Sequence, residues 1–298
     1  MKKTKPSYSP LHLSRNLAKS AFSLFEVSIV ILIIAMVITG FTQGDKITKR
    51  FRIKGAQSIT KSSSVSAIKG LVFWIDSTSD NSFISSETSN NTNLSYWHDT
   101  NSQSTLSNNL TRTSDSHIQY KNNAINGLPA VYFDGSAISG GILTGNAIIT
   151  SGNKFTFFAV TKSDDATSAT SRVIFSNGST NGFLYQKDGS DLKREVVFSG
   201  VNSSNGGSIT SSAEISSAIY DGVNLEFYAN GATVISSTAT SSFVQPVGEA
   251  LYVGSDSASS KAWKGYIAEI IIYDNALDKD ERKLVENYLS KKWNIATK

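Results

Sequence analysis

The sequence predicts a mainly β protein with one long hydrophobic helix at its start and a short amphipathic helix at its end. Three observations support this prediction. An apolar run occupies residues 22–41, many short β-type segments separated by turn dipeptides follow residue 70, and apolar residues recur at every fourth position from 285 to 293. Many short strands without intervening helices are typical of a β-sandwich or a jelly roll.

The apolar run at residues 22–41 contains a single charged residue, Glu26. A helix of this length spans about 30 Å, the thickness of the hydrocarbon core of a bilayer. A secretory signal fits less well, because its apolar core has only about 7–15 residues and a small-residue cleavage site follows it. A plain membrane anchor gives no reason for Glu26. A carboxylate in such a stretch is costly and indicates a function, unless Glu26 lies near the headgroups and reaches water.

The residues at the start of this run, AFSLFEV at positions 21–27, resemble the processing site of type IV prepilins and type II secretion pseudopilins. The resemblance implies that a prepilin peptidase cleaves between Ala21 and Phe22. It also implies that Phe22 becomes the N-methylated first residue of the mature chain. Glu26, the fifth mature residue, would then pair with the Phe22 amine of a neighbouring subunit during assembly. Ala21 departs from the glycine that is usual in this family, although it is also small.

The same resemblance implies a division of the chain and a location. Residues 1–21 would form a leader peptide, residues 22–69 a transmembrane and assembly helix with a linker, and residues 70–298 an outward-facing domain. The protein would cross the inner membrane once, with its C-terminal domain in the periplasm, and then join a pilus or pseudopilus that can reach the cell surface. Its partners would be the peptidase, other pilin or pseudopilin subunits and the inner membrane. The alternative is a membrane-anchored, lectin-like adhesin that does not polymerise.

Basic residues gather beside the apolar run and not over the remaining domain. Residues 70–298 hold 16 basic and 22 acidic residues, a formal net charge of −6. A nucleic-acid-binding domain usually presents a basic face, so no nucleic-acid partner is predicted. The chain has no cysteine, and a domain of more than about 200 residues can bury enough core without disulfides.

Residues 42–69 are expected to continue the helix, because Ile47 and Phe51 are four apart, and to end it near Ser62–Ser64. Gly44 and Gly55 weaken this prediction by about 1 kcal/mol each relative to alanine. Strands are then expected at 71–75, 130–133, 155–161, 172–176, 182–186, 194–199, 225–229, 232–236, 250–254 and 265–273. The polar stretch 76–117 is expected to form loops.

Local signals fix several turns and the last helix. Asn230-Gly231 lies between two short strands and is the kind of pair that accepts positive φ in a tight hairpin. Asp278 is expected to cap the C-terminal helix, with Glu281 at the capping-box spacing. Val285, Leu289 and Trp293 then form a stripe that is expected to pack on the sandwich.

The segment WKGYIAEIIIYDNALDKDERKLVENYLSKKWNI at 263–295, together with NGLPAVYFDG at 126–135, resembles the laminin-G-like, concanavalin A-like jelly rolls of bacterial surface proteins. FTFFAV at 155–160 and DGVNLEFYANG at 221–231 fit the same pattern. The resemblance covers residues 70–296 and implies a jelly-roll sandwich, with surface polysaccharide as a candidate partner. It says little about function, because this fold is used by lectins, glucanases and structural modules.

The sequence favours a protein that is not an enzyme. Glucanases of this fold place two glutamates close together around an aspartate, whereas the glutamates here are scattered. Glu269 is expected to face outward or to lie at the rim. With no cysteine and three histidines, His12, His98 and His117, a zinc site is not expected.

Two weaker candidates for ligand contact remain. Trp97, His98 and Asp99 are consecutive and would together stack on a sugar and hydrogen-bond to it, although a tryptophan in a polar loop more often attaches that loop to the core. Calcium is considered for Asp164, Asp165, Asp188 and Asp256. No compact loop supplies the six to eight oxygens that Ca²⁺ takes, so no cofactor is predicted.

Overall fold

The computed structural model describes residues 24–103, 108–112, 118–136, 143–146, 154–177, 183–188, 193–198, 201–238, 250–256 and 261–298. The chain divides into two compact units, Met1–Thr48 and Lys49–Lys298. Each unit is described separately below.

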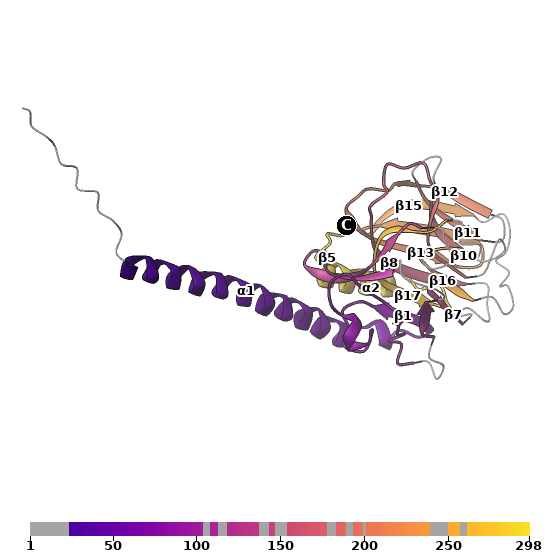
Figure 1. Cartoon of the computed structure of the whole chain (residues 1–298). Coiled ribbons are helices and arrows are strands. Elements are labelled where there is room, and N and C mark those ends of the chain that lie inside the picture. The colour runs from indigo at the N-terminus through magenta and orange to yellow at the C-terminus, as the bar shows by residue number, and fades with distance from the viewer. Residues whose placement is uncertain are drawn as a thin grey trace, which may run out of the picture. The chain divides into compact units, whose positions relative to one another are not determined.

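Helix α1, Leu24–Lys61, begins in the first unit and ends in the second (Figure 1). It passes through Gly44 and Gly55 and ends just before Ser62, as the sequence predicts. The large apolar side chains between Leu24 and Ile38 are 41–89% exposed. Within the residues that the structure describes, no helix is long and apolar enough to cross a membrane.

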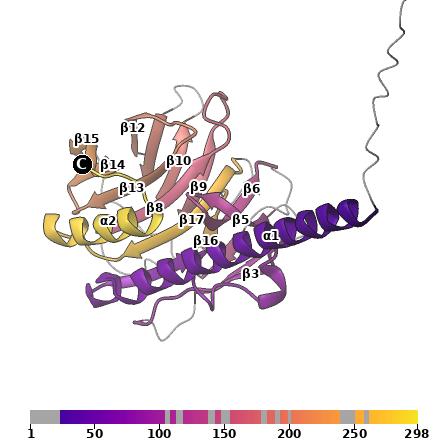
Figure 2. The ribbon, with the colours of Figure 1, turned by 90° about the vertical axis from the view of Figure 1, so that its left-hand side faces the viewer.

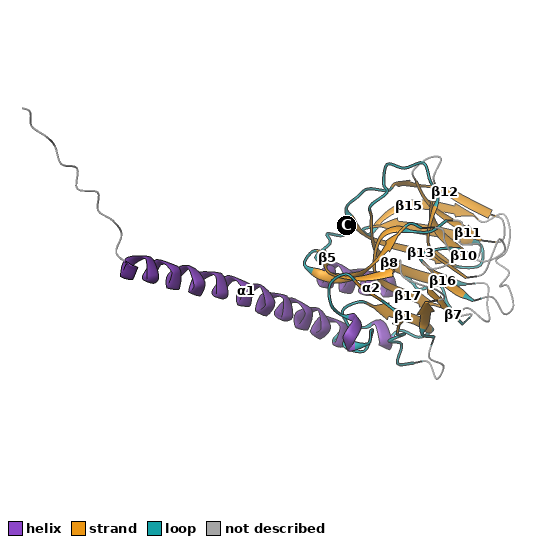
Figure 3. Ribbon diagram, in the orientation of Figure 1, coloured by secondary structure: helices purple, strands orange, loops and turns teal. Residues whose placement is uncertain are grey.

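The second unit is a sandwich of two antiparallel sheets, shown with the remaining loops in Figure 3. Among the described residues the large sheet has nine strands, and its order is β15 (Ala232–Thr238), β14 (Asn224–Ala229), β13 (Ala213–Tyr220), β8 (Phe155–Ser163), β17 (Lys264–Tyr273), β6 (Leu128–Asp134), β5 (Ile118–Ile125) and β2 (Thr92–Asn93), with β1 (Leu71–Asp76) paired to β17. The described part of the small sheet has eight strands, in the order β12 (Val201–Ser208), β11 (Lys193–Phe198), β10 (Phe183–Asp188), β9 (Arg172–Asn177), β16 (Leu251–Val253), β7 (Leu143–Gly145), β4 (Leu110–Arg112) and β3 (Tyr96–Trp97).

Besides the last turns of α1, the described residues of the second unit form two 3-10 turns and one further helix. The 3-10 turns η1 (Val65–Ala67) and η2 (Ser85–Glu87) lie in the connections before and after β1, and helix α2 (Lys279–Trp293) follows β17. The predicted jelly-roll-type sandwich with a C-terminal helix is therefore confirmed.

The central strands of the large sheet are buried on both faces. Its inner face packs against the small sheet through aromatic residues such as Phe157, whose ring centroid lies 5.0 Å from that of Phe175. Its outer face is covered by α2, where Phe158 joins a second cluster with Leu289 and Trp293. Figure 2 shows α2 in yellow beside β8, β13 and β17. Because successive strand residues point to opposite faces, neighbours such as Phe157 and Phe158 belong to different cores.

The turns and caps follow their predicted chemistry. Asn230 (φ 48°) and Gly231 (φ 76°) join β14 to β15 in the left-handed region that two-residue hairpins require. The Asp278 side chain accepts hydrogen bonds from the backbone of Asp280 and Glu281, and the Glu281 carboxylate accepts one from the backbone of Asp278. The predicted capping box of α2 is confirmed.

The sequence prediction missed several strands. Strand β13 pairs with β8 from Ala213↔Lys162 to Tyr220↔Phe155, and β5 and β12 are also strands. Within 76–117, where loops were expected, the described residues form η2 and the short strands β2, β3 and β4. Glu269 was expected to face outward or to lie at the rim. It is only 1% exposed, because α2 covers the outer face on which it lies.

Candidate functional site

The predicted processing and assembly residues lie at the start of the chain. Ala21 and Phe22 are outside the described residues. Glu26 lies in the first turn of α1, where its side chain is exposed.

The three consecutive residues Trp97, His98 and Asp99 are not arranged as a sugar site. Trp97 is fully buried, and its ring centroid lies 5.7 Å from that of Phe83, so its indole has no free face for a sugar ring. The imidazole of His98 stacks on Tyr96. Asp99 Oδ1 accepts hydrogen bonds from the backbone nitrogens of Trp74 (3.0 Å) and Asn101 (2.9 Å), and burial raises the pKa of the Asp99 carboxyl.

The acidic residues considered for calcium do not come together. No three His, Asp or Glu side chains in the described ranges are placed to hold a metal ion. Asp165 Oδ2 instead accepts a hydrogen bond from Arg172 Nε at 2.8 Å.

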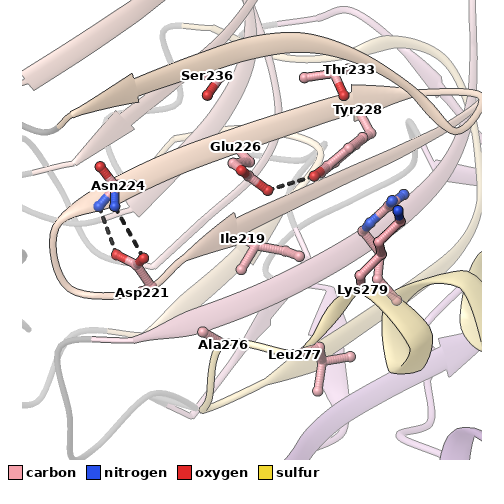
Figure 4. Close-up of a pocket in the computed structure, with 11 residues that line it drawn as sticks. Ile219, Asp221, Asn224, Glu226, Tyr228, Thr233, Ser236, Ala276, Leu277 and Lys279 are labelled. Atoms are coloured by element: carbon pink, nitrogen blue, oxygen red, sulfur yellow. Dashed lines mark hydrogen bonds between the residues drawn. The ribbon is translucent and has the colours of Figure 1, made fainter.

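A groove of about 740 Å³ opens on the outer face of the large sheet, beside the N-terminal end of α2 (Figure 4). We call it the α2 groove. Its lining comes from β13, β14, β15, the turn between β13 and β14, the connection between β17 and α2, and the first turn of α2. The side chains that give it chemical character are Asp221, Asn224, Glu226, Tyr228, Lys279 and Arg282.

One wall of the α2 groove is the turn between β13 and β14. Asp221 Oδ1 accepts hydrogen bonds from the backbone nitrogens of Val223 (2.8 Å) and Asn224 (2.7 Å), and Asn224 Nδ2 donates to Asp221 Oδ2 (3.2 Å). The backbone N–H of Asn224 is the main cause of a lowered pKa at Asp221. The turn therefore holds an ionised carboxylate in a fixed position.

The floor of the α2 groove is built around Tyr228. Its hydroxyl donates to Glu226 Oε2 at 2.5 Å, as Figure 4 shows. The guanidinium carbon of Arg282 lies 3.7 Å from the centroid of the Tyr228 ring, the arrangement of a cation–π contact. Burial, followed by the hydrogen bond to Glu226, raises the pKa of Tyr228 to about 12. The tyrosine therefore remains a neutral donor at physiological pH.

Arg282 has an incomplete set of hydrogen-bond partners. Its Nη1 donates to Glu286 Oε2 at 2.5 Å, and Glu286 Oε1 accepts from Ser217 Oγ at 2.6 Å. The Nε of Arg282 finds no acceptor within the described part of the chain, although the residue is only 4% exposed. A buried donor without an acceptor is costly, by about 1–3 kcal/mol. This donor is unpaired among the described residues, and it is closed off from solvent although its side chain lines the α2 groove.

The sequence shows no sign of this groove. Asp221, Glu226 and Arg282 come from a turn, a strand and a helix, and only the fold brings them together. The predicted capping box marks one wall of the groove, but it does not indicate which residues lie opposite.

A smaller cavity, of about 290 Å³, lies between the last turns of α1 and the loop that follows β1. Gln57 Nε2 donates to the carbonyl oxygen of Thr78 (2.7 Å) and to Asp80 Oδ1 (2.8 Å). Lys54 Nζ lies 3.3 Å from Asp80 Oδ2, with both side chains largely exposed. These contacts attach the end of α1 to the sandwich within the second unit.

The C-terminal half of α2 covers a fully buried charge cluster. Lys292 Nζ lies 2.8 Å from Asp76 Oδ2 and 2.8 Å from Glu269 Oε2, and all three side chains are 0% exposed. Burial raises the pKa of Glu269, against the opposing effect of the Lys292 ammonium. Glu269 accepts four hydrogen bonds, from Trp74 Nε1 (2.8 Å), Tyr288 Oη (2.6 Å), Lys292 Nζ (2.8 Å) and Trp293 Nε1 (2.7 Å).

Residues 134–281 match the family model described as the concanavalin A-like lectin/glucanases superfamily. This match confirms the concanavalin A-like, laminin-G-like jelly-roll prediction over those residues. No curated protein matches the sequence.

Among solved structures, domain 4 of AbnA, a GH43 extracellular arabinanase from Geobacillus stearothermophilus solved in complex with arabinotriose, is 16% identical, with a TM-score of 0.54. The match covers 74% of this chain and 98% of that domain. Trypanosoma rangeli sialidase is 15% identical, with a TM-score of 0.50 and coverage of 75% of this chain. The match takes in 33% of the sialidase chain. At these identities the likeness shows the fold alone, a concanavalin A-like sandwich that resembles domains associated with glycosidases and sialidases.

Proposed function

We propose that this protein is a pilin-like or pseudopilin subunit that displays its jelly-roll domain on the outside of a type IV pilus or type II secretion filament. The observation that carries the proposal is the exposed apolar surface of α1 between Leu24 and Ile38. A continuous apolar surface of this kind is unfavourable in water. Lipid before assembly and neighbouring helices after assembly would cover it.

The residues at the start of α1 would supply two opposite charges for assembly. Cleavage after Ala21 would create an amine at Phe22, close to the carboxylate of Glu26. Either charge is expensive in an apolar environment, and pairing relieves both. In this proposal Glu26 of one subunit meets the Phe22 amine of the next, and the protein resides in the inner membrane until it is assembled.

We further propose that the jelly-roll domain binds surface polysaccharide and does not catalyse a reaction. The arabinanase domain with the same fold was solved with arabinotriose, which supports a saccharide as ligand. The acidic groups of the α2 groove support binding over catalysis, because Asp221 is engaged by its turn and Glu226 by Tyr228.

Intact-mass analysis of the membrane-extracted protein tests the processing step. The expected result is the loss of residues 1–21 and the gain of one methyl group on Phe22. A chain that keeps its leader in cells that process other prepilins would overturn the proposal.

Glu26→Ala tests assembly. The variant is expected to be processed but to enter filaments at least ten-fold less efficiently than the wild type. Ser28→Ala is the matched control, because Ser28 lies on the same exposed turns and its hydroxyl donates to the carbonyl oxygen of Leu24 at 2.7 Å. If Glu26→Ala enters filaments at the wild-type level, the pairing mechanism is wrong. A processed wild-type chain that never enters a filament would instead support the anchored adhesin.

A further inference from the structure

We infer that the α2 groove is a binding site for an uncharged oligosaccharide. The inference rests on the proposed polysaccharide-binding function and assigns that function to particular residues. It places the ligand on the outer face of the large sheet, between β13–β15 and the first turns of α2, and not at Trp97.

The size and lining of the α2 groove fit such a ligand. Its volume of about 740 Å³ lies within the range of about 300–1,000 Å³ that is usual for ligand sites. Ile219, Ala276 and Leu277 supply an apolar side (Figure 4), which suits the C–H face of a sugar ring. Thr233 and Ser236 supply exposed hydroxyls from β15 on the opposite side.

The polar groups of the groove alternate between donors and acceptors. Asp221 and Glu226 are acceptors, whereas the ammonium of Lys279 and the guanidinium of Arg282 are donors. A sugar hydroxyl both donates and accepts, so adjacent hydroxyls can bond to carboxylates and cationic donors in turn.

The charges of the lining favour an uncharged ligand. Two acidic side chains, Asp221 and Glu226, face two basic ones, Lys279 and Arg282. Arg282 also pairs with Glu286 behind the floor, so little positive charge is left to attract an anion. An acidic saccharide would meet two carboxylates, and a cationic ligand would meet the Lys279 ammonium.

Binding is tested on the full chain in detergent micelles by isothermal titration calorimetry. The uncharged probes are arabinotriose, maltotriose and cellotriose, and the acidic probes are sialyllactose and trigalacturonate. The expected result is saturable binding of at least one uncharged probe, at least ten-fold tighter than that of either acidic probe.

The site is tested with the double variant Thr233→Ala/Ser236→Ala, which removes two exposed hydroxyls from the groove. It is expected to weaken binding of the uncharged probe at least five-fold. Arg282→Lys, which keeps the charge but removes the planar guanidinium that lines the groove, is expected to weaken it at least ten-fold, with folding checked by circular dichroism. Ser86→Ala/Ser89→Ala, which removes exposed hydroxyls outside the groove, is the matched control and is expected to bind as the wild type does.

Three results would overturn the inference. If an uncharged probe binds and the groove variants leave its affinity unchanged, the protein binds saccharide elsewhere, and the proposed function survives without this site. If an acidic probe binds best, the ligand class is wrong. If no probe binds, both the groove assignment and the polysaccharide part of the proposed function fail, while the filament role is still decided by the Glu26→Ala assay.

Discussion

The two ends of α2 cover the same face of the same sheet, yet the buried cation at each end has a different set of partners. At the C-terminal end, Lys292 is enclosed by Asp76, Glu269 and the hydroxyl of Tyr288, which lies 3.0 Å from its Nζ. At the N-terminal end, Arg282 pairs with Glu286 and lines the open α2 groove, and its Nε has no acceptor among the described residues. The first arrangement is complete within the protein, whereas the second leaves room for a ligand.

This difference separates structural from functional polar groups. A buried charge that has every partner contributes to a unique packing but offers nothing to a ligand. A buried donor that lacks a partner lowers stability, so its presence in a folded protein needs an explanation. The comparison predicts that substitutions at the C-terminal end change stability and that substitutions at the N-terminal end change binding.

The largest effect is expected for Lys292→Met. Removing the ammonium leaves the carboxylates of Asp76 and Glu269 together in a dry interior, which costs about 3–5 kcal/mol of unfolding free energy. Chemical denaturation measures this loss. Lys291→Met is the matched control, because the neighbouring Lys291 is exposed, and a change within about 0.5 kcal/mol is expected. Equal effects of the two substitutions would show that the cluster has no special role.

Glu269→Gln is expected to cost about 1–3 kcal/mol of unfolding free energy, because its new amide would face donors where the carboxylate accepted four hydrogen bonds.

The pH dependence of stability tests the role of Glu269 more specifically. Burial raises the folded-state pKa of Glu269 above its ordinary value of 4.5, so the folded protein holds this proton more tightly than the unfolded chain does. The contribution of Glu269 to stability is therefore complete below pH 4.5 and declines as the pH rises through the raised pKa.

Denaturation of the wild type and Glu269→Gln at a series of pH values measures this contribution as a difference. The stability advantage of the wild type is expected to shrink as the pH rises above 4.5. An advantage that grows with pH would mean that Lys292 stabilises the ionised carboxylate more than burial disfavours it.

A smaller effect is expected at the cap of α2. Asp278→Ala removes the acceptor for the backbone N–H groups of Asp280 and Glu281, at a cost of about 1 kcal/mol. Asp280→Ala, two residues further on, serves as the control in thermal unfolding, since the Asp280 side chain does not cap the helix. A cost as large for Asp280→Ala would mean that charge near the helix end matters more than the cap.

The smallest stability effect is expected in the α2 groove. Thr233→Ala/Ser236→Ala is expected to change the free energy of unfolding by less than about 0.5 kcal/mol, because both side chains are exposed. Thermal unfolding without saccharide checks this. A loss comparable to that of Lys292→Met would contradict the division between the two ends of α2.

Local chemistry predicted from the sequence agrees well with the structure. The hairpin at Asn230-Gly231 depends on two residues that accept positive φ, and the cap at Asp278 depends on a spacing of three. Strands such as β8 were recognisable because their apolar residues are continuous. Strand β13 was missed because Ser216 and Ser217 interrupt its apolar pattern, although both are buried. Ser217 is satisfied by Glu286 of α2, a partner that no local rule identifies.

The sites formed between distant segments could not be predicted from the sequence, because their partners are not identified by local rules. Nothing in the sequence distinguishes Asp76, Glu269 and Lys292 from other charged residues, and Glu269 was assigned to the surface. Trp97 could be weighed only as one of two alternatives, because its burial depends on Phe83 and on residues of other strands. The packing of α2 on the large sheet determines which charged side chains pair with one another and which also line the open groove.

The position of β1 determines how the domain would bear tension. Strand β1 follows the end of α1 through η1, and it pairs directly with β17, from Phe73↔Ile272 to Asp76↔Glu269. Strand β17 also pairs with β8 and β6, so it lies in the interior of the large sheet. A pull on the last turns of α1 is therefore carried by the β1–β17 ladder to an interior strand of the large sheet.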